Sequence, residues 1–216
     1  MDYNLESLGT RQFEHLVQAL AVKVLGGRVS VFGDGADGGR EATWEGPTSS
    51  LGSLDAWNGY GVLQAKMRQH PLDVADNLEW LKAQVKRELG EWALHDGRRK
   101  KQPNYFVVAT NVRLSATLGG GKDTIKQTIM ESIATDALAI EDFRVWDYDD
   151  IKALLDDAPG IRRTYSALLT PGDVVETLLE QVEQSATDFA YALRQHAARS
   201  FRDDTHAKPD PSRDGA

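Results

Sequence analysis

Cysteine is absent from this sequence of 216 residues. Its absence excludes disulfide bonds, thiolate zinc sites, iron–sulfur clusters and cysteine nucleophiles. A reducing compartment is the simplest setting for such a chain, so we expect a cytoplasmic protein. Long apolar runs are also missing, and none approaches the roughly 18 residues that a membrane helix requires. These short runs lead us to expect no association with a membrane, and the acidic N-terminus, MDYNLE, lacks the apolar segment of a secretory signal.

An excess of basic residues is missing as well. The 25 Lys and Arg residues stand against 33 Asp and Glu residues, which gives a net charge of -8. Because proteins that bind nucleic acid by charge alone are usually basic, any nucleic-acid role here depends on a local patch or on bound cations. The hydrophobic share of 41% is typical of a soluble globular protein and excludes a disordered chain.

The spacing of apolar residues predicts one α/β domain followed by helical segments. We expect helices over residues 10–25, 73–94, 123–139, 149–155 and 171–201, with Thr10 as the N-cap of the first. We expect strands over residues 29–32, 40–45, 60–67, 105–109 and 143–148. This order predicts a mixed central sheet with helices on both faces. The predicted organisation is a domain over residues 1–165, a helical extension over 171–202 and a disordered polar tail over 203–216.

Polar residues share faces on two of the predicted strands. Side chains alternate along a strand, so Gln64 and Lys66 lie on one face of the third strand, and Glu41 and Thr43 share a face of the second. A lysine inside a strand is costly to bury unless it has an anionic partner or a function. One interpretation is therefore a cross-strand ion pair between Glu41 and Lys66, and the other is a functional site.

These residues resemble the motifs of a known family. Residues 35–41, which read GADGGRE, and residues 62–66, which read VLQAK, look like the PD-(D/E)XK restriction-endonuclease-like nucleases. They are closest to the Mrr-like branch, whose second half reads Q-x-K. The resemblance covers residues 8–112 by motif and order of elements. Residues 5–111 also resemble the N-terminal effector region of bacterial NACHT/STAND-type proteins implicated in antiphage defence.

The resemblance implies an α-β-β-β-α-β core and a metal-dependent endonuclease that hydrolyses phosphodiester bonds in DNA as a prokaryotic antiviral effector. It implies Mg²⁺ as the cofactor, with Mn²⁺ as a substitute, because magnesium prefers oxygen ligands and needs few carboxylates beside a phosphate. It also implies DNA as a partner. The C-terminal helix is then a contact for a second copy or for an NTPase or sensor module.

By the same resemblance, Glu41 is the principal metal ligand. The side chain of Gln64 and the backbone carbonyl of Ala65 complete the metal's surroundings. Lys66 orients the attacking water and stabilises the negative charge that develops on the phosphate. Because an amide binds a cation less strongly than the carboxylate more usual in the family, Gln64 favours a weak or single-metal site.

Two further acidic residues belong to the predicted site. A helix that bears a glutamate normally precedes the three-stranded segment in this family, and Glu14 stands at that place. Glu14 then binds the metal directly or through water. Asp37 supports the glycine-rich turn or a second metal.

Basic residues near these motifs are candidates for contacts to DNA phosphates. They are Arg40, Arg68, Lys82, Lys86, Arg98, Arg99, Lys100 and Lys101. The alternative for each is an ordinary solvated surface residue, and Arg68 is the strongest candidate because it lies just after Lys66.

Three alternatives stay open at this point. The domain is a nuclease, a catalytically weak or inactive module of the same fold used for interaction, or an RNase on the same scaffold. The apolar stripe over residues 174–197 packs on the domain, joins two copies or forms a stalk toward a further module.

Overall fold

The computed structural model describes residues 2–26, 28–32, 41–48, 57–94, 99 and 101–205, and for residues 196–205 it describes the backbone alone. The chain divides into two compact units. We call Met1–Leu168 the α/β unit and Leu169–Ala216 the C-terminal unit. None of the helices in the described part of the chain combines the length and the apolar character that crossing a membrane requires.

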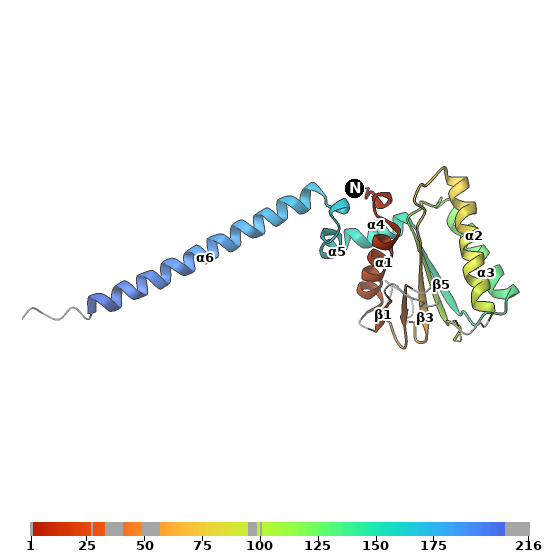
Figure 1. Cartoon of the computed structure of the whole chain (residues 1–216), viewed down its shortest axis with the longest axis horizontal. Coiled ribbons are helices and arrows are strands. Elements are labelled where there is room, and N and C mark those ends of the chain that lie inside the picture. Colours follow the sequence, from red (N-terminus) through yellow and green to blue (C-terminus); the bar gives the residue numbers. More distant parts are fainter. Residues whose placement is uncertain are drawn as a thin grey trace, which may run out of the picture. The chain divides into compact units, whose positions relative to one another are not determined.

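A five-stranded mixed sheet forms the centre of the α/β unit (Figure 1). Its order is β1-β2-β3-β4-β5. The strands are β1 (Val29–Val31), β2 (Ala42–Trp44), β3 (Gly61–Lys66), β4 (Tyr105–Thr110) and β5 (Asp142–Trp146). The first three strands are antiparallel, and β3, β4 and β5 are parallel. The predicted mixed sheet with helices on both faces is confirmed.

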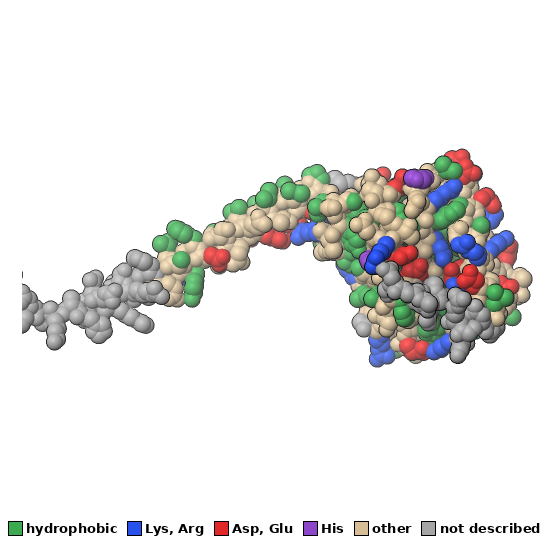
Figure 2. All heavy atoms as spheres, viewed as in Figure 1, with side chains coloured by type: hydrophobic (Ala, Val, Ile, Leu, Met, Phe, Trp, Pro, Cys, Tyr) green, Lys and Arg blue, Asp and Glu red, His purple; other side chains and the backbone are tan. Residues whose placement is uncertain are grey.

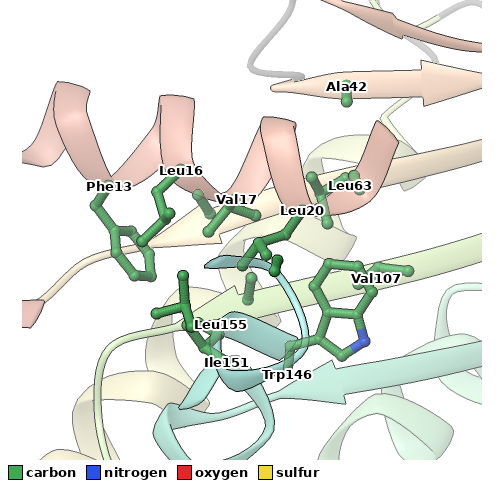
Figure 3. Packing of buried hydrophobic residues seen from close by; sticks show 14 of the residues in the cluster. Phe13, Leu16, Val17, Leu20, Ala42, Leu63, Val107, Trp146, Ile151 and Leu155 are labelled. Atoms are coloured by element: carbon green, nitrogen blue, oxygen red, sulfur yellow. The ribbon is translucent and has the colours of Figure 1, made fainter. Parts of the chain in front are cut away.

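Helices cover both faces of this sheet (Figure 1). The helices of the α/β unit are α1 (Thr10–Leu25), α2 (Val74–Ala93), α3 (Gly121–Thr135), α4 (Tyr148–Asp156) and α5 (Pro159–Arg163), with single 3₁₀ turns at η1 (Leu5–Ser7) and η2 (Ser166–Leu168). On one face, α1 and α4 pack against Leu63, Val107 and Trp146 (Figure 3). On the other face, α2 and α3 pack against Val62 and Phe106. Because β4 is covered on both sides, all but its first residue is buried, as its near-continuous apolar sequence predicts.

Three details differ from the sequence predictions. Thr10 is the first residue of α1 and not its N-cap, which is Gly9 in extended backbone with no capping side chain. Helix α3 lies earlier than predicted, and the chain leaves it through Ala137, whose φ is +49°. In the C-terminal unit, α6 (Pro171–Thr205) continues past residue 203, the first residue of the predicted disordered tail.

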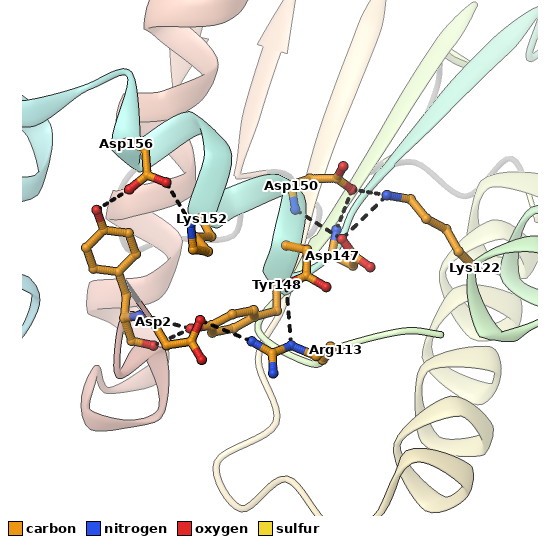
Figure 4. A network of polar contacts seen from close by, with 10 residues as sticks. Asp2, Arg113, Lys122, Asp147, Tyr148, Asp150, Lys152 and Asp156 are labelled. Atoms are coloured by element: carbon orange, nitrogen blue, oxygen red, sulfur yellow. Dashed lines mark hydrogen bonds and ion pairs between the residues drawn. The ribbon is translucent and has the colours of Figure 1, made fainter. Parts of the chain in front are cut away.

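A polar network ties the N-terminal segment to α4 (Figure 4). The Tyr3 hydroxyl donates to Asp156 Oδ1 at 2.5 Å, and the Tyr148 hydroxyl donates to the Tyr3 carbonyl at 3.0 Å. Asp147 and Asp150 form a reciprocal capping box at the start of α4, and Lys122 lies 2.5 Å from Asp150 Oδ2. Burial, together with Asp150, raises the pKa of Asp147 to about 6. This network holds α3 and α4 at the carboxyl edge of the parallel strands.

Candidate functional site

Glu41, Gln64 and Lys66 lie on the same face of the sheet. Ala42 pairs with Leu63 across the β2–β3 ladder, so the residue before Ala42 lies opposite Gln64. Alternation along β3 then places Gln64 and Lys66 on the face that carries Val62, toward α2. The strands thus bring Glu41 beside Gln64 and Lys66, although the sequence separates Glu41 from them by more than twenty positions.

The Glu41 carboxyl group lies in a poorly solvated place. Its Oε2 atom is buried and has no hydrogen-bond partner among the described residues. Burial raises the pKa of Glu41 to about 8, and the negative charge of Glu88 adds to this, whereas Lys66 and the backbone of Glu41 and Ala65 lower it. An orphaned carboxyl oxygen in such a place is a group that a cation would satisfy.

Lys66 is held between two polar side chains. Its Nζ donates to Gln64 Oε1 at 3.1 Å and to Glu88 Oε2 at 2.9 Å. The side chains of Lys66 and Glu88 are only 14% and 7% exposed, so this ion pair is largely withdrawn from water. The predicted cross-strand ion pair between Glu41 and Lys66 therefore does not form, because the carboxylate that pairs with Lys66 is Glu88 of α2.

Glu88 also binds Arg99. The Arg99 guanidinium lies 2.5 Å from Glu88 Oε1 and 2.7 Å from Glu91 Oε2, and it stacks over the Trp92 ring at 4.8 Å. Arg99, a predicted phosphate contact, is 6% exposed. The structure thus places it in an internal ion-pair network behind Lys66.

Glu14 is carried by the helix on the opposite face of the sheet. Its side chain is half-buried on α1, which packs against the core around Leu63. One helical turn later, Gln18 donates from Nε2 to the backbone carbonyls of Glu41, at 2.9 Å, and Phe32, at 2.8 Å. The α1 row that carries Glu14 thus reaches the backbone of Glu41 through Gln18.

Arg68 and Lys101 are engaged with neighbouring side chains. Arg68 donates from Nη1 to Asn77 Oδ1 at 2.7 Å, and its guanidinium lies 5.7 Å from the Trp80 ring centroid. Lys101 Nζ is an exposed partner of Glu45 at 2.6 Å. Both remain at the surface or near it, so each is accessible to a long anionic ligand.

Lys82 and Lys86 line a groove between α2 and α3. The groove has a volume of about 490 Å³, and Asp123 and Glu131 line it as well. Lys82 also pairs with Glu79 at 2.9 Å. The carboxylates in and beside this groove offset the charge of the two lysines. The remaining predicted residues, Asp37, Arg40, Arg98 and Lys100, lie outside the described residues.

The sequence motifs do not include Glu88 and Gln18, although each is a polar residue in a helix row that faces the core. Glu88 follows Leu81 and Val85 at spacings of four and three, so a charged residue stands in the apolar stripe of its helix. A carboxylate at a core position needs a buried cation as its partner. Gln18 likewise stands in the α1 row that contains Glu14 and Leu25.

The donors near Glu41 suit a weakly held magnesium ion. Within the described residues, no group of three or more His, Cys, Asp or Glu side chains is arranged to hold a metal ion. The oxygen donors available are the Glu41 carboxylate, the Gln64 amide and the Ala65 carbonyl, which is the one-carboxylate set that magnesium accepts when water and phosphate supply the rest.

No family model matches this chain, and no curated protein matches it.

Proposed function

We propose that the α/β unit is a metal-dependent endonuclease that hydrolyses phosphodiester bonds in DNA and serves as a prokaryotic antiviral effector. One observation carries the proposal: Glu41, just before β2, shares one face of the sheet with Gln64 and Lys66 of β3. Lys66 Nζ lies 3.1 Å from Gln64 Oε1, and the same ammonium lowers the pKa of the Glu41 carboxyl. Their likeness to the PD-(D/E)XK motif and the mixed five-stranded sheet support the same proposal.

Each residue of the site has a separate role in hydrolysis. Glu41, Gln64 and the Ala65 carbonyl would hold Mg²⁺, which when bound supplies charge neutralisation at the scissile phosphate. Lys66 presents a positive charge that Gln64 and Glu88 hold in place before substrate arrives. A fixed ammonium at this position stabilises the negative charge that develops on the phosphate oxygens and orients the attacking water. Gln18 fixes the backbone of Glu41 from the other side of the sheet.

A cleavage assay with Mg²⁺ on plasmid DNA, linear DNA and RNA in parallel tests this proposal. Lys66→Ala should reduce DNA cleavage by about 10² or more, the order expected on losing a positioned electrostatic group. Glu41→Gln should abolish cleavage by weakening metal binding, with partial rescue by excess Mn²⁺. Lys152→Ala, which removes a lysine that pairs with Asp156 within α4, is the matched control and should cleave at nearly the wild-type rate.

One observation favours the second candidate, a catalytically weak or inactive module of the same fold. Lys66 already has a buried carboxylate partner, so its charge is partly neutralised by Glu88. If the full chain binds DNA but cleaves neither DNA nor RNA with Mg²⁺ or Mn²⁺, the second candidate replaces the nuclease. Cleavage confined to RNA would change the substrate class and keep the catalytic residues.

A further inference from the structure

Helix α6 carries a regular apolar row along its described length. The row consists of Val175, Leu179, Val182, Ala186, Phe189 and Leu193. Its spacings alternate strictly between four and three residues. Its five large side chains are between 55% and 67% exposed. Figure 2 shows hydrophobic side chains along this helix.

Alternating spacings of four and three are the repeat of a coiled coil. In such a repeat, the apolar row faces a partner helix, and each apolar side chain fits between four residues of that partner. We call the row from Val175 to Leu193 the α6 seam. The face opposite the seam is mainly polar, as at Thr177, Gln184 and Asp188, and Tyr191 is its exposed aromatic residue. The Gln184 amide donates to Asp188 Oδ1 at 2.9 Å along this face.

A helix of this kind needs a partner. With 35 residues it is about 52 Å long. Helices stay marginal in water unless an apolar face is packed, and soluble monomers rarely leave a long apolar patch uncovered. The seam is therefore a surface built for contact.

The partner must present a matching seam. In the described part of the α/β unit, large exposed hydrophobic side chains occur singly or in pairs on separate elements, such as Val22, Leu72, Leu118 and Met130. None of these described elements offers a second row of the same repeat. A second copy of α6 does, because identical seams are self-complementary around a two-fold axis.

We propose that two copies of this chain pair through the α6 seam as a two-helix coiled coil. The proposal does not depend on nuclease activity, since it uses only the C-terminal unit. Each α6 seam packs against the α6 seam of the other copy, and the contact is made by Leu179, Val182, Phe189 and their neighbours.

Sedimentation of the full chain tests the pairing. The wild type should sediment at twice its 23.8 kDa mass at micromolar concentration. Val182→Asp should weaken self-association by at least about 100-fold, because two unpaired carboxylates would enter the seam. Gln184→Asp adds the same group on the polar face two residues along, and it should leave the dimer intact. A monomeric wild type, or a Val182→Asp protein that stays dimeric, would overturn the proposal.

Cross-linking locates the contact, since the chain has no cysteine of its own. A double variant, Val182→Cys with Ala186→Cys, places thiols in adjacent seam layers and should form an interchain disulfide for either orientation of the helices. The control, Gln184→Cys with Asp188→Cys, has the same spacing on the polar face. Reducible dimers from the control and none from the seam variant would contradict an α6 seam even if the chain is dimeric.

Discussion

Gly61 is the point at which β3 and the neighbouring aromatic residues come closest. A Cβ atom at this position would lie 1.9 Å from Cζ2 of Trp44, a ring that is itself buried. Trp44 stacks on Trp57 with centroids 5.9 Å apart, and Trp57 stacks on Tyr105 at 5.0 Å. Glycine is therefore required at the first residue of β3 for steric reasons, and the aromatic stack in turn secures the strand that carries Gln64 and Lys66.

Gly61→Ala should destabilise the protein by about 1–3 kcal/mol or more, because the rings of the stack have little room to move. Gly90→Ala in α2 is the matched control. Nothing lies within 4 Å of the Cβ that it would add, so it should stabilise the helix by ~0.5–1 kcal/mol. Urea unfolding of the two variants measures both effects, and equal midpoints would refute the steric account.

Glu41 should make stability depend on pH in the absence of metal. The pKa of Glu41 in the folded protein, about 8, lies above its ordinary value of 4.5. The stabilisation that the protonated Glu41 carboxyl gives the folded state is therefore complete below pH 4.5. It is lost as the pH rises through 8, because the folded state must then release a proton that it holds tightly. Glu41→Gln has no such proton to release, so at pH 9 its free energy of unfolding should exceed that of the wild type by on the order of 2–5 kcal/mol.

Thermal melts of both proteins at pH 5 and pH 9 in the presence of a chelator measure this difference. Glu45→Gln, at an exposed position four residues along, is the control and should follow the wild-type profile. Under the proposed function, Mn²⁺ at pH 8 should raise the Tm of the wild type and not that of Glu41→Gln. Parallel profiles for the wild type and Glu41→Gln would show that the carboxyl is not held protonated by its surroundings.

At the scale of elements, the Glu88 carboxylate of α2 connects Lys66 of the candidate site to the helix that packs on the core. Glu88 lies on the same side of the helix as Leu81 and Val85, which pack on the sheet, and it bonds both Lys66 and Arg99. A buried ion-pair network adds little net stability when intact but is costly to break, because the remaining charges lose their partner without regaining water. Helix α2 is therefore coupled to β3 by charge as well as by packing.

Glu88→Ala should cost about 3 kcal/mol, since it removes the ion-pair partner of Lys66 and one of the two glutamates that pair with Arg99. Glu79→Ala removes a glutamate of the same helix that pairs with Lys82 at the surface, and it should change stability by less than ~0.5 kcal/mol. Chemical denaturation compares the two. A Glu88→Ala protein as stable as Glu79→Ala would mean that Lys66 and Arg99 find water or other partners.

At the scale of the whole molecule, the α/β unit contains the complete sheet and both cores. The segment after β5 belongs to it, because Tyr148, Ile151 and Leu155 of α4 are part of the core that α1 covers. The Tyr3–Tyr148 hydrogen bonds join the N-terminal segment of this unit to α4. The α/β unit should therefore fold without α6.

A chain ending at Leu168 should unfold cooperatively in urea, as a domain with a closed core does. A chain ending at Trp146 loses five buried core residues, the larger of them worth about 2–5 kcal/mol each, and should not fold. Near-UV circular dichroism distinguishes the two outcomes. Loss of the cooperative transition in the longer variant would place part of the fold's stability in the C-terminal unit.

Local pattern was sufficient for most elements. The apolar stripe of α1 and the continuous apolar run of β4 predicted their positions, because helix and strand periodicities are set by which side chains of a single segment meet the core. The alternation in β3 likewise predicted that Gln64 and Lys66 share a face. The end of α6 was not predictable in this way, since polar residues 202–205 extend a helix without contributing an apolar pattern.

The partners of these side chains were decided only by tertiary structure. The sequence places Glu41 and Lys66 on adjacent strands and so suggests that they pair, but the packing of α2 brings Glu88 to Lys66 instead. The same packing buries Arg99, which reads as part of an exposed basic loop. Sequence periodicity determines which face a residue occupies, whereas the partner of a buried charge depends on which distant carboxylate the packed helix delivers within hydrogen-bonding distance.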